Sequence, residues 1–270
     1  AHYDHVGYGN AQNSYGPTGY IHNGADDNAS GTAALLEMVE AFSLASLKPR
    51  RTVVFAFWDG EEKGLLGSKH WMSQPTVALE RVVLGMNMDM VGRLRPRGLE
   101  VSGIRTAQGL RSLVSRQNAE TDLLLDFTWE VADNSDHYSF YERRIPFLMM
   151  HTGLHDEYHR PSDDAHLINT EGASEVTRLM VYTLDALANA DGPFEFRAAS
   201  RTETPSTQRA YERPLEPLPG RLGIRWQTQG DLLGATEAVV QTERQQVATT
   251  GWGAKLLSYQ EPSGLWGGGL

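Results

Sequence analysis

Two adjacent carboxylates, Glu61 and Glu62, follow a short apolar run and have the chemistry for binding a cation and moving a proton. The run from Val53 to Trp58 is β-branched and aromatic, which predicts a strand covered on both faces. In open α/β sheets, ligands gather beyond the carboxyl ends of the strands. One acid at such a place can bind a metal while its neighbour transfers a proton. By itself, however, the pair is more typical of a solvated loop than of a site.

Other acids and histidines stand at comparable points. His2 and Asp4 form an H-x-D triplet, and the two-residue period of a strand points both to one side, so that Asp4 can orient a ligand at His2. Asp89 follows a second apolar run, residues 82–88. Asp26 and Asp27 precede an apolar pattern with helical period. Capping that helix explains one acid, but not two acids framed by glycines.

Histidines cluster after a third apolar run, residues 145–150. This loop contains His151, His155, His159 and His166. Loops carry functional sites more often than ordered elements do, so the cluster favours a binding or catalytic role. Spacing does not separate His155 from His159 as a ligand, and Asp163 can orient His159. His137 begins a short helix, and we expect it to pack or to contact substrate rather than to bind metal.

Composition restricts the classes of possible partner and the residue types that can bind a metal. The 270 residues carry a net charge of −10, which disfavours nucleic acid and anionic membranes as partners. There is no cysteine, so a transition metal must be held by His, Asp and Glu. The longest apolar run is too short to span a bilayer, so we expect no membrane span. The chain starts at Ala1 with a candidate ligand at position 2, and we expect a processed chain or fragment with at least one strand upstream.

The elements that must position these residues alternate along the chain. Apolar runs predict strands at 53–58, 82–88, 123–130 and 145–150, with a short one inside 93–103, and helical periods separate them. This predicts an α/β fold with a mixed, mostly parallel central sheet flanked by helices. We expect a catalytic domain over residues 1–190, with N-terminal strands missing. Residues 191–218 have the composition of a linker, and residues 219–270 are expected to form a small β-rich appendage.

Six side chains are therefore expected at one edge of the sheet: His2, Asp26, Glu61, Glu62, Asp89 and His159. Carboxylates that converge without a cation repel one another and titrate abnormally. A pair of divalent ions removes this problem, and donors without sulfur suit zinc in a hydrolytic site.

The order of the motifs HYD, GADDNASG, DGEEKGLLGS, NMDMVG and SDHYSFYERRIPF…YHRPSDD resembles the co-catalytic di-zinc aminopeptidases, in a clan that includes glutamate carboxypeptidase-like enzymes and glutaminyl cyclases. The resemblance covers about residues 1–190 and implies a zinc-exopeptidase, phosphorylase/hydrolase-like fold. It also implies a zinc-dependent exopeptidase that cleaves N-terminal peptide bonds of peptides or proteins with a metal-bridging water. Relatives are mostly exported, which implies an extracellular or periplasmic location.

The resemblance further implies roles for individual residues. His2 and Asp89 would hold one of two Zn²⁺ ions per chain, Glu62 and His159 the other, and Asp26 would bridge them. Glu61 would be the general base, and Tyr158 would stabilise the oxyanion. The supporting residues would be Asp4, Asp27 and Asp163, with His137 and His155 as substrate contacts, and the Asp26–Asp27 peptide would be cis.

Two other functions remain open. A glutaminyl cyclase-like acyltransferase would use a single zinc, so the presence of both His2 and Asp89 disfavours it. A receptor-like binding domain without catalysis would not need the base at Glu61. Residues 220–224 faintly resemble the opening of a PDZ-like module, which would be truncated here.

Overall fold

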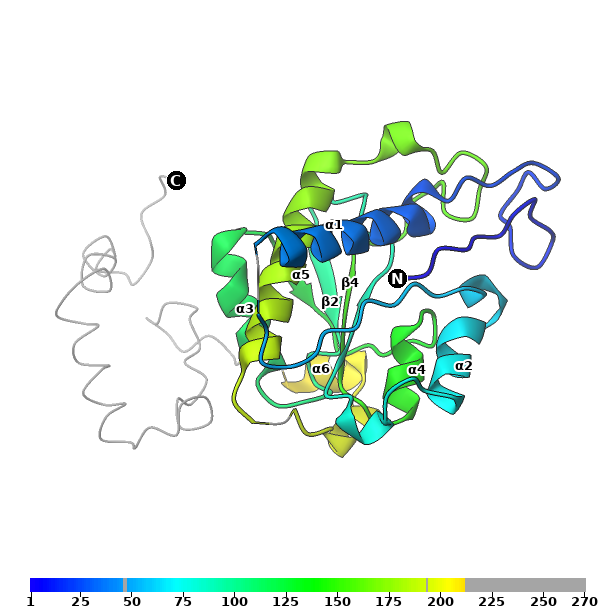
Figure 1. The fold of residues 1–270 in the computed structure, drawn as a ribbon. Helices are drawn as coiled ribbons and strands as arrows, with labels where there is room; N and C mark the ends of the chain where they lie inside the picture. Colours follow the sequence, from blue (N-terminus) through cyan, green and yellow to red (C-terminus); the bar gives the residue numbers. More distant parts are fainter. Residues whose placement is uncertain (46–47, 193, 212–270) are drawn as a thin grey trace, which may run out of the picture. The chain divides into compact units, whose positions relative to one another are not determined.

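The computed structural model describes residues 1–45, 48–192 and 194–211. The chain divides into two compact units, Ala1–Gln208 and Arg209–Leu270. The sheet and the candidate site both belong to the first unit (Figure 1). The expected β-rich appendage at 219–270 and most of the expected linker lie outside the described residues.

A four-stranded mixed sheet forms the centre of the first unit, in the order β1-β4-β2-β3. β1 pairs in parallel with β4, and β2 pairs in parallel with β3, whereas β2 and β4 run antiparallel. The strands are β1 (Gly85–Met88), β2 (Leu99–Ser102), β3 (Leu125–Phe127) and β4 (Phe147–His151). The predicted α/β architecture with a mixed, mostly parallel sheet is confirmed.

Helices cover both faces of this sheet (Figure 1). Along β4, Leu148 and Met150 face the main core, whereas Phe147 and Met149 face a second cluster with Tyr141. Alternate residues of a strand point to opposite faces, so the two cores lie on opposite sides. The main core is closed by α1 (Gly31–Leu44), α3 (Leu110–Gln117) and α5 (Thr170–Asn189), and the second by α4 (His137–Glu142), which packs on α2 (Leu66–Ser73).

Short helical segments complete the described part of the chain. They are the π-type turn η1 (Ala25–Ser30), the 3₁₀ turns η2 (Glu61–Lys63), η3 (Leu79–Arg81), η4 (Asn118–Glu120), η5 (Ala165–Leu167) and η6 (Ala198–Arg201), and α6 (Pro205–Tyr211). Asn169 caps α5 by accepting a hydrogen bond from the N–H of Gly172. The described helices include none that is long and apolar enough to cross a membrane.

The prediction of a fully covered strand at 53–58 is wrong. Within the described residues this segment is extended, but only Trp58 forms a bridge, to His2. Val54 remains 57% exposed and Phe57 37% exposed. A cavity of about 640 Å³ is lined by both the segment and β1. Among the described strands β1 pairs only with β4, so the segment has no strand beside it to form a ladder.

The linker predicted at residues 191–218 begins later than expected, because the structure holds part of that range in place. Arg197 donates hydrogen bonds to both carboxylate oxygens of Glu203, and Glu203 in turn pairs with Arg105. Phe196 forms an isolated antiparallel bridge with Ala107. Residues 194–208 therefore belong to the compact first unit, because partly exposed ion pairs and the bridge at Phe196 hold a segment whose composition alone suggests a linker.

Candidate metal centre

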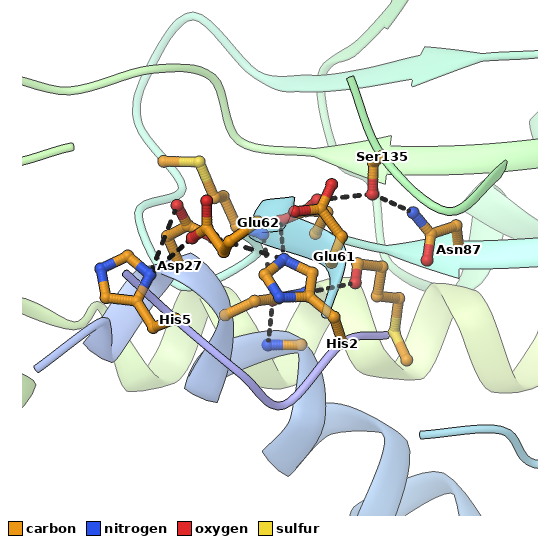
Figure 2. A network of polar contacts seen from close by, with 12 residues as sticks. His2, His5, Asp27, Glu61, Glu62, Asn87 and Ser135 are labelled. Carbon is orange, nitrogen blue, oxygen red and sulfur yellow. Dashed lines mark hydrogen bonds and ion pairs between the residues drawn. The ribbon is translucent and has the colours of Figure 1, made fainter. Parts of the chain in front are cut away.

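Five segments distant in the sequence converge on one carboxylate, that of Asp27. They are the N-terminal residues, η1, η2, the end of β1 and the loop after β4. Figure 2 shows Asp27 between the rings of His5 and His2, with Glu61 and Glu62 beside them. The site thus lies at the carboxyl ends of β1 and β4, where the sequence predicts it.

His2 is fixed from several directions. Its backbone bridges Trp58, and its carbonyl oxygen accepts a hydrogen bond from Thr32 Oγ1 at 2.8 Å. Nδ1 lies 3.1 Å from the carbonyl oxygen of Asp4 and 3.6 Å from its Oδ1. Nε2 therefore faces the opposite way, toward Oδ1 of Asp27 at 3.4 Å and Oδ1 of Asp89 at 3.5 Å.

A second group forms around the other oxygen of Asp27. Nε2 of His159 lies 3.0 Å from Oδ2 of Asp27 and 3.2 Å from Oε2 of Glu62. Asp27 thus offers one oxygen to the group with His2 and the other to the group with His159. The five residues His2, Asp27, Glu62, Asp89 and His159 are together, and four of them belong to the predicted ligand set.

The prediction that Asp26 takes the central position is wrong in its geometry. Oδ1 of Asp26 accepts hydrogen bonds from the N–H of Gly92 at 2.6 Å and from Ser30 Oγ at 3.0 Å, and Oδ2 lies 3.2 Å from Nε2 of His155. Gly92 is needed here, because a Cβ would lie 2.8 Å from that oxygen. The cis peptide joins Asp27 and Asn28, one position later than expected.

Asp163 has a different partner from the one predicted. Its fully buried carboxylate accepts the backbone N–H of Asp26 at 2.8 Å and that of Asp27 at 3.0 Å through Oδ2, and Oδ1 pairs with Arg93 at 3.3 Å. Asp163 therefore fixes the backbone that carries Asp27, rather than the ring of His159. A charge-assisted bond of this kind is stronger than a neutral one.

One carboxylate oxygen of Asp89 is held by Ser135 and Asn87, two residues that the sequence did not single out. Ser135 Oγ donates to Oδ2 of Asp89 at 2.6 Å, and Ser135 accepts from Asn87 Nδ2 at 2.7 Å (Figure 2). Oδ1 of Asp89 remains directed at His2. The motif NMDM contained the signal for Asn87, because residues 87 and 89 share one side of a strand.

The pKa values of several groups in the site are shifted far from their ordinary values. Burial, followed by the charge of Asp89, raises the pKa of Glu61 to about 9. Burial lowers the pKa of His2, but hydrogen bonds to Asp27, Asp4 and Asp89 outweigh it and raise that pKa far above its ordinary value. Burial also raises the pKa of the Tyr158 hydroxyl, helped by the nearby charge of Asp27. Such shifts concentrate at functional sites.

The arrangement fits two zinc ions. His2, Asp27 and Asp89 each offer an atom within 4.8 Å of the others. Two ligands of one tetrahedral zinc are about 3.3 Å apart, as follows from bonds of about 2.0–2.1 Å. The separations between nitrogen and oxygen atoms in the two groups, from 3.0 to 3.5 Å, match this spacing. The carboxylates of Asp27, Glu61, Glu62 and Asp89 also repel one another, and bound cations would offset that repulsion.

His137 takes packing, one of the two roles expected for it, and His155 contacts Asp26. His137 is 2% exposed, packs on Phe147 at 4.7 Å and bonds through Nε2 to the carbonyl oxygen of Ala132, so it packs rather than lining the site. Nε2 of His155 lies 3.2 Å from Oδ2 of Asp26, and its Nδ1 lies 3.1 Å from Oε2 of Glu157. His5, absent from the expected set, instead reaches Glu62 at 2.8 Å. Its position three residues after His2 was the available signal.

Comparison with known proteins decides the family. Residues 1–184 match Peptidase family M28. The chain belongs to this family. The predicted membership of the zinc-exopeptidase clan is thereby confirmed.

Two aminopeptidases and one protein of the same fold illustrate what this M28 chain is similar to. Aminopeptidase YwaD of Bacillus subtilis strain 168 is 31% identical over 158 residues, which are 55% of this chain and 34% of that protein. The solved aminopeptidase of Aneurinibacillus sp. strain AM-1 is 25% identical with a TM-score of 0.56, over 65% of this chain and 42% of that one. A Porphyromonas gingivalis glutaminyl cyclase shares the fold, with a TM-score of 0.51 and 21% identity over 69% of this chain and 71% of that one. The M28 chain spans about a third of the length of YwaD and less than half of the Aneurinibacillus enzyme.

Proposed function

We propose that this M28 chain is the catalytic part of a zinc-dependent exopeptidase that removes residues from the amino terminus of peptides. The observation that carries the proposal is the position of Asp27, whose two oxygens face His2 and His159 on opposite sides. Together with Asp89 and Glu62, the residues Asp27, His2 and His159 would hold two Zn²⁺ ions. Bound zinc polarises the scissile carbonyl and makes water nucleophilic at neutral pH.

Glu61 is the proposed proton carrier. It precedes Glu62 on η2, and its N–H donates to Oδ1 of Asp4 at 3.1 Å, which ties its backbone to the residue beside His2. Its pKa of about 9 in the absence of cations reflects burial and the nearby Asp89. A carboxylate with a raised pKa takes a proton from water readily and holds it until the leaving amine accepts it.

Tyr158 is the proposed oxyanion donor. Its ring stacks on His159 with centroids 3.9 Å apart, and the charge of Asp27 helps to keep its hydroxyl protonated. A protonated hydroxyl held beside the ligands can donate a hydrogen bond to the oxygen that becomes negative in the transition state. Removing one such donor typically costs about 10²–10³ in kcat.

The test is hydrolysis by the purified chain of aminoacyl-anilides and of matched peptides with free or acetylated amino termini. We expect cleavage only of substrates with a free terminus, loss of activity with a chelator and recovery with Zn²⁺. Cleavage of acetylated peptides or unchanged activity after chelation would overturn the proposal. Binding of a single zinc with cyclisation of N-terminal glutamine would instead assign the cyclase activity. Binding of peptide without turnover would assign a receptor-like role.

A further inference from the structure

His5 is a largely but not fully buried histidine beside the candidate metal centre, and the proposed ligand set does not use it. Its side chain is 10% exposed. Its ring meets the ring of His159 edge-on, with centroids 5.6 Å apart. Gly24, at φ +59°, gives the ring its space, because a Cβ there would lie 2.6 Å from Cγ of His5. The ring therefore has a fitted place next to the second group of ligands.

His5, Asp27 and Glu62 offer atoms within 4.8 Å of one another, so His5 could itself be a ligand, but its closest contact has the length of a hydrogen bond. Nδ1 lies 2.8 Å from Oε1 of Glu62, a hydrogen-bond length, and 3.9 Å from Oδ2 of Asp27. Neither value is near the separation of about 3.3 Å between ligands of one tetrahedral zinc. The carboxylate of Glu62 has only acceptor atoms when ionised, so Nδ1–H of His5 is the donor.

The two oxygens of Glu62 are thus divided between two histidines. Oε1 receives the hydrogen bond from His5, whereas Oε2 faces His159 at 3.2 Å and so turns toward Asp27. A carboxylate on a short turn can rotate freely unless something holds one of its oxygens. Ligands of metals are commonly oriented by hydrogen bonds of this kind.

We propose that His5 is a positioning residue that holds Oε1 of Glu62, so that Oε2 alone is presented to the second metal ion. This inference rests on the proposed function, because it assumes that Glu62 and His159 bind a metal. It assigns to His5, the first residue after the H-x-D triplet, a role separate from that of His2, whose Nε2 faces the first ion.

The experiment compares His5→Ala and His5→Asn with the unmodified chain. The apo-proteins are titrated with Zn²⁺ against a competing chelator of known affinity, without any measurement of turnover. An Asn amide places an N–H close to the position of Nδ1, whereas Ala removes it. We expect His5→Ala to weaken the second zinc ion about 10–100-fold, and His5→Asn to recover affinity to within a few-fold. The first ion should bind both variants as it binds the unmodified chain.

Controls separate the possible outcomes. His70→Ala removes an exposed histidine of α2 and should leave both affinities unchanged, and thermal unfolding of each apo-variant checks that it is folded. Unchanged binding of both ions to His5→Ala would overturn the proposal. Equal losses in His5→Ala and His5→Asn would show that His5 is a ligand, which also overturns it. Two bound ions with the expected His5 pattern but no peptide hydrolysis would overturn only the proposed function.

Discussion

Asp26 and Asp27 are neighbours in the chain, yet their carboxylates face opposite sides of η1. Asp26 bonds to the N–H of Gly92, whereas Asp27 lies between His2 and His159. The reversal follows from the backbone, because Asp27 (φ −107°, ψ 90°) and Asn28 (φ −134°, ψ 43°) are both non-helical within η1. The two residues therefore have separable roles.

Substituting each acid separately tests that division. Asp27→Asn should lower the zinc content and reduce kcat/KM more than about 100-fold, because it removes a charged ligand from both groups. Asp26→Asn keeps an oxygen for Gly92 and should stay within about tenfold, the lower range for residues that support ligands. Zinc per chain by elemental analysis and kcat/KM on an aminoacyl-anilide are the measurements. A larger loss for Asp26→Asn would reverse the assignment.

Glu61 should be needed for turnover and not for metal binding. Glu61→Gln keeps the shape of the side chain but cannot take a proton, so kcat should fall by about 10²–10⁴. Zinc affinity should change little, because the adjacent Glu62 is the residue that faces His159. Chelator competition and steady-state kinetics check the two expectations. Loss of zinc in this variant would make Glu61 a ligand instead.

The raised pKa of Glu61 predicts a pH dependence of the apo-protein. A carboxyl whose folded pKa is raised favours the folded state below its ordinary value of 4.5, and this contribution is lost as pH rises toward about 9. The chelated, unmodified chain should therefore lose stability over that window relative to chelated Glu61→Gln. A Tm gap of at least about 2 °C at pH 8, compared with pH 5, is the expected size. A constant gap would contradict the cause.

Asp163 should support both stability and metal binding. Asp163→Ala leaves two backbone N–H groups, those of Asp26 and Asp27, without their acceptor, which costs about 1–3 kcal/mol for a buried donor. Urea unfolding of the apo-protein measures this loss. Asp163→Asn keeps one acceptor oxygen and should lose less. The half-buried neighbour Asp164 provides the matched control, because Asp164→Ala removes only a bond from Asn23.

Glu203 gives a second pH prediction, away from the candidate metal centre. Hydrogen bonds from Arg197 and Arg105 lower its pKa from 4.5 to about 2. The resulting stability is complete above about 4.5 and is lost as pH falls toward about 2. Glu203→Gln should cost about 1 kcal/mol at pH 7 and nothing at the acid end, by urea unfolding. The exposed pair Glu175–Arg178 is the control, and Glu175→Gln should cost less than about 0.5 kcal/mol.

The sequence predicted the parts of the fold and site that depend on periodicity and on strand ends. The sheet class and the convergence of His2 and Asp89 follow from such patterns, whereas His159 was separated from His155 only by the family resemblance. The separate roles of the adjacent acids Asp26 and Asp27 were harder to predict, because the backbone torsions of η1 decide which of the two faces the histidines. Periodicity carries no information on those torsions.

Partners distant in sequence account for the remaining differences. The hydrogen bond of His5 with Glu62 spans 57 positions, and the bonds of Asp163 with the N–H groups of η1 span about 137. No local pattern encodes such pairs. The segment 53–58 has the composition of a buried strand, but pairing needs a neighbour at the correct distance, and the described residues supply only the bridge at Trp58.

That extended segment has a practical consequence for work with the isolated 270-residue chain. Its N–H and C=O groups form no backbone hydrogen bonds from residue 53 to residue 57 within the described part of the chain, and Val54 is exposed beside them. An open, apolar edge of this kind is a template for edge-to-edge association of protein molecules. Concentrated samples should therefore self-associate, and dilute solutions suit kinetics and zinc titrations better.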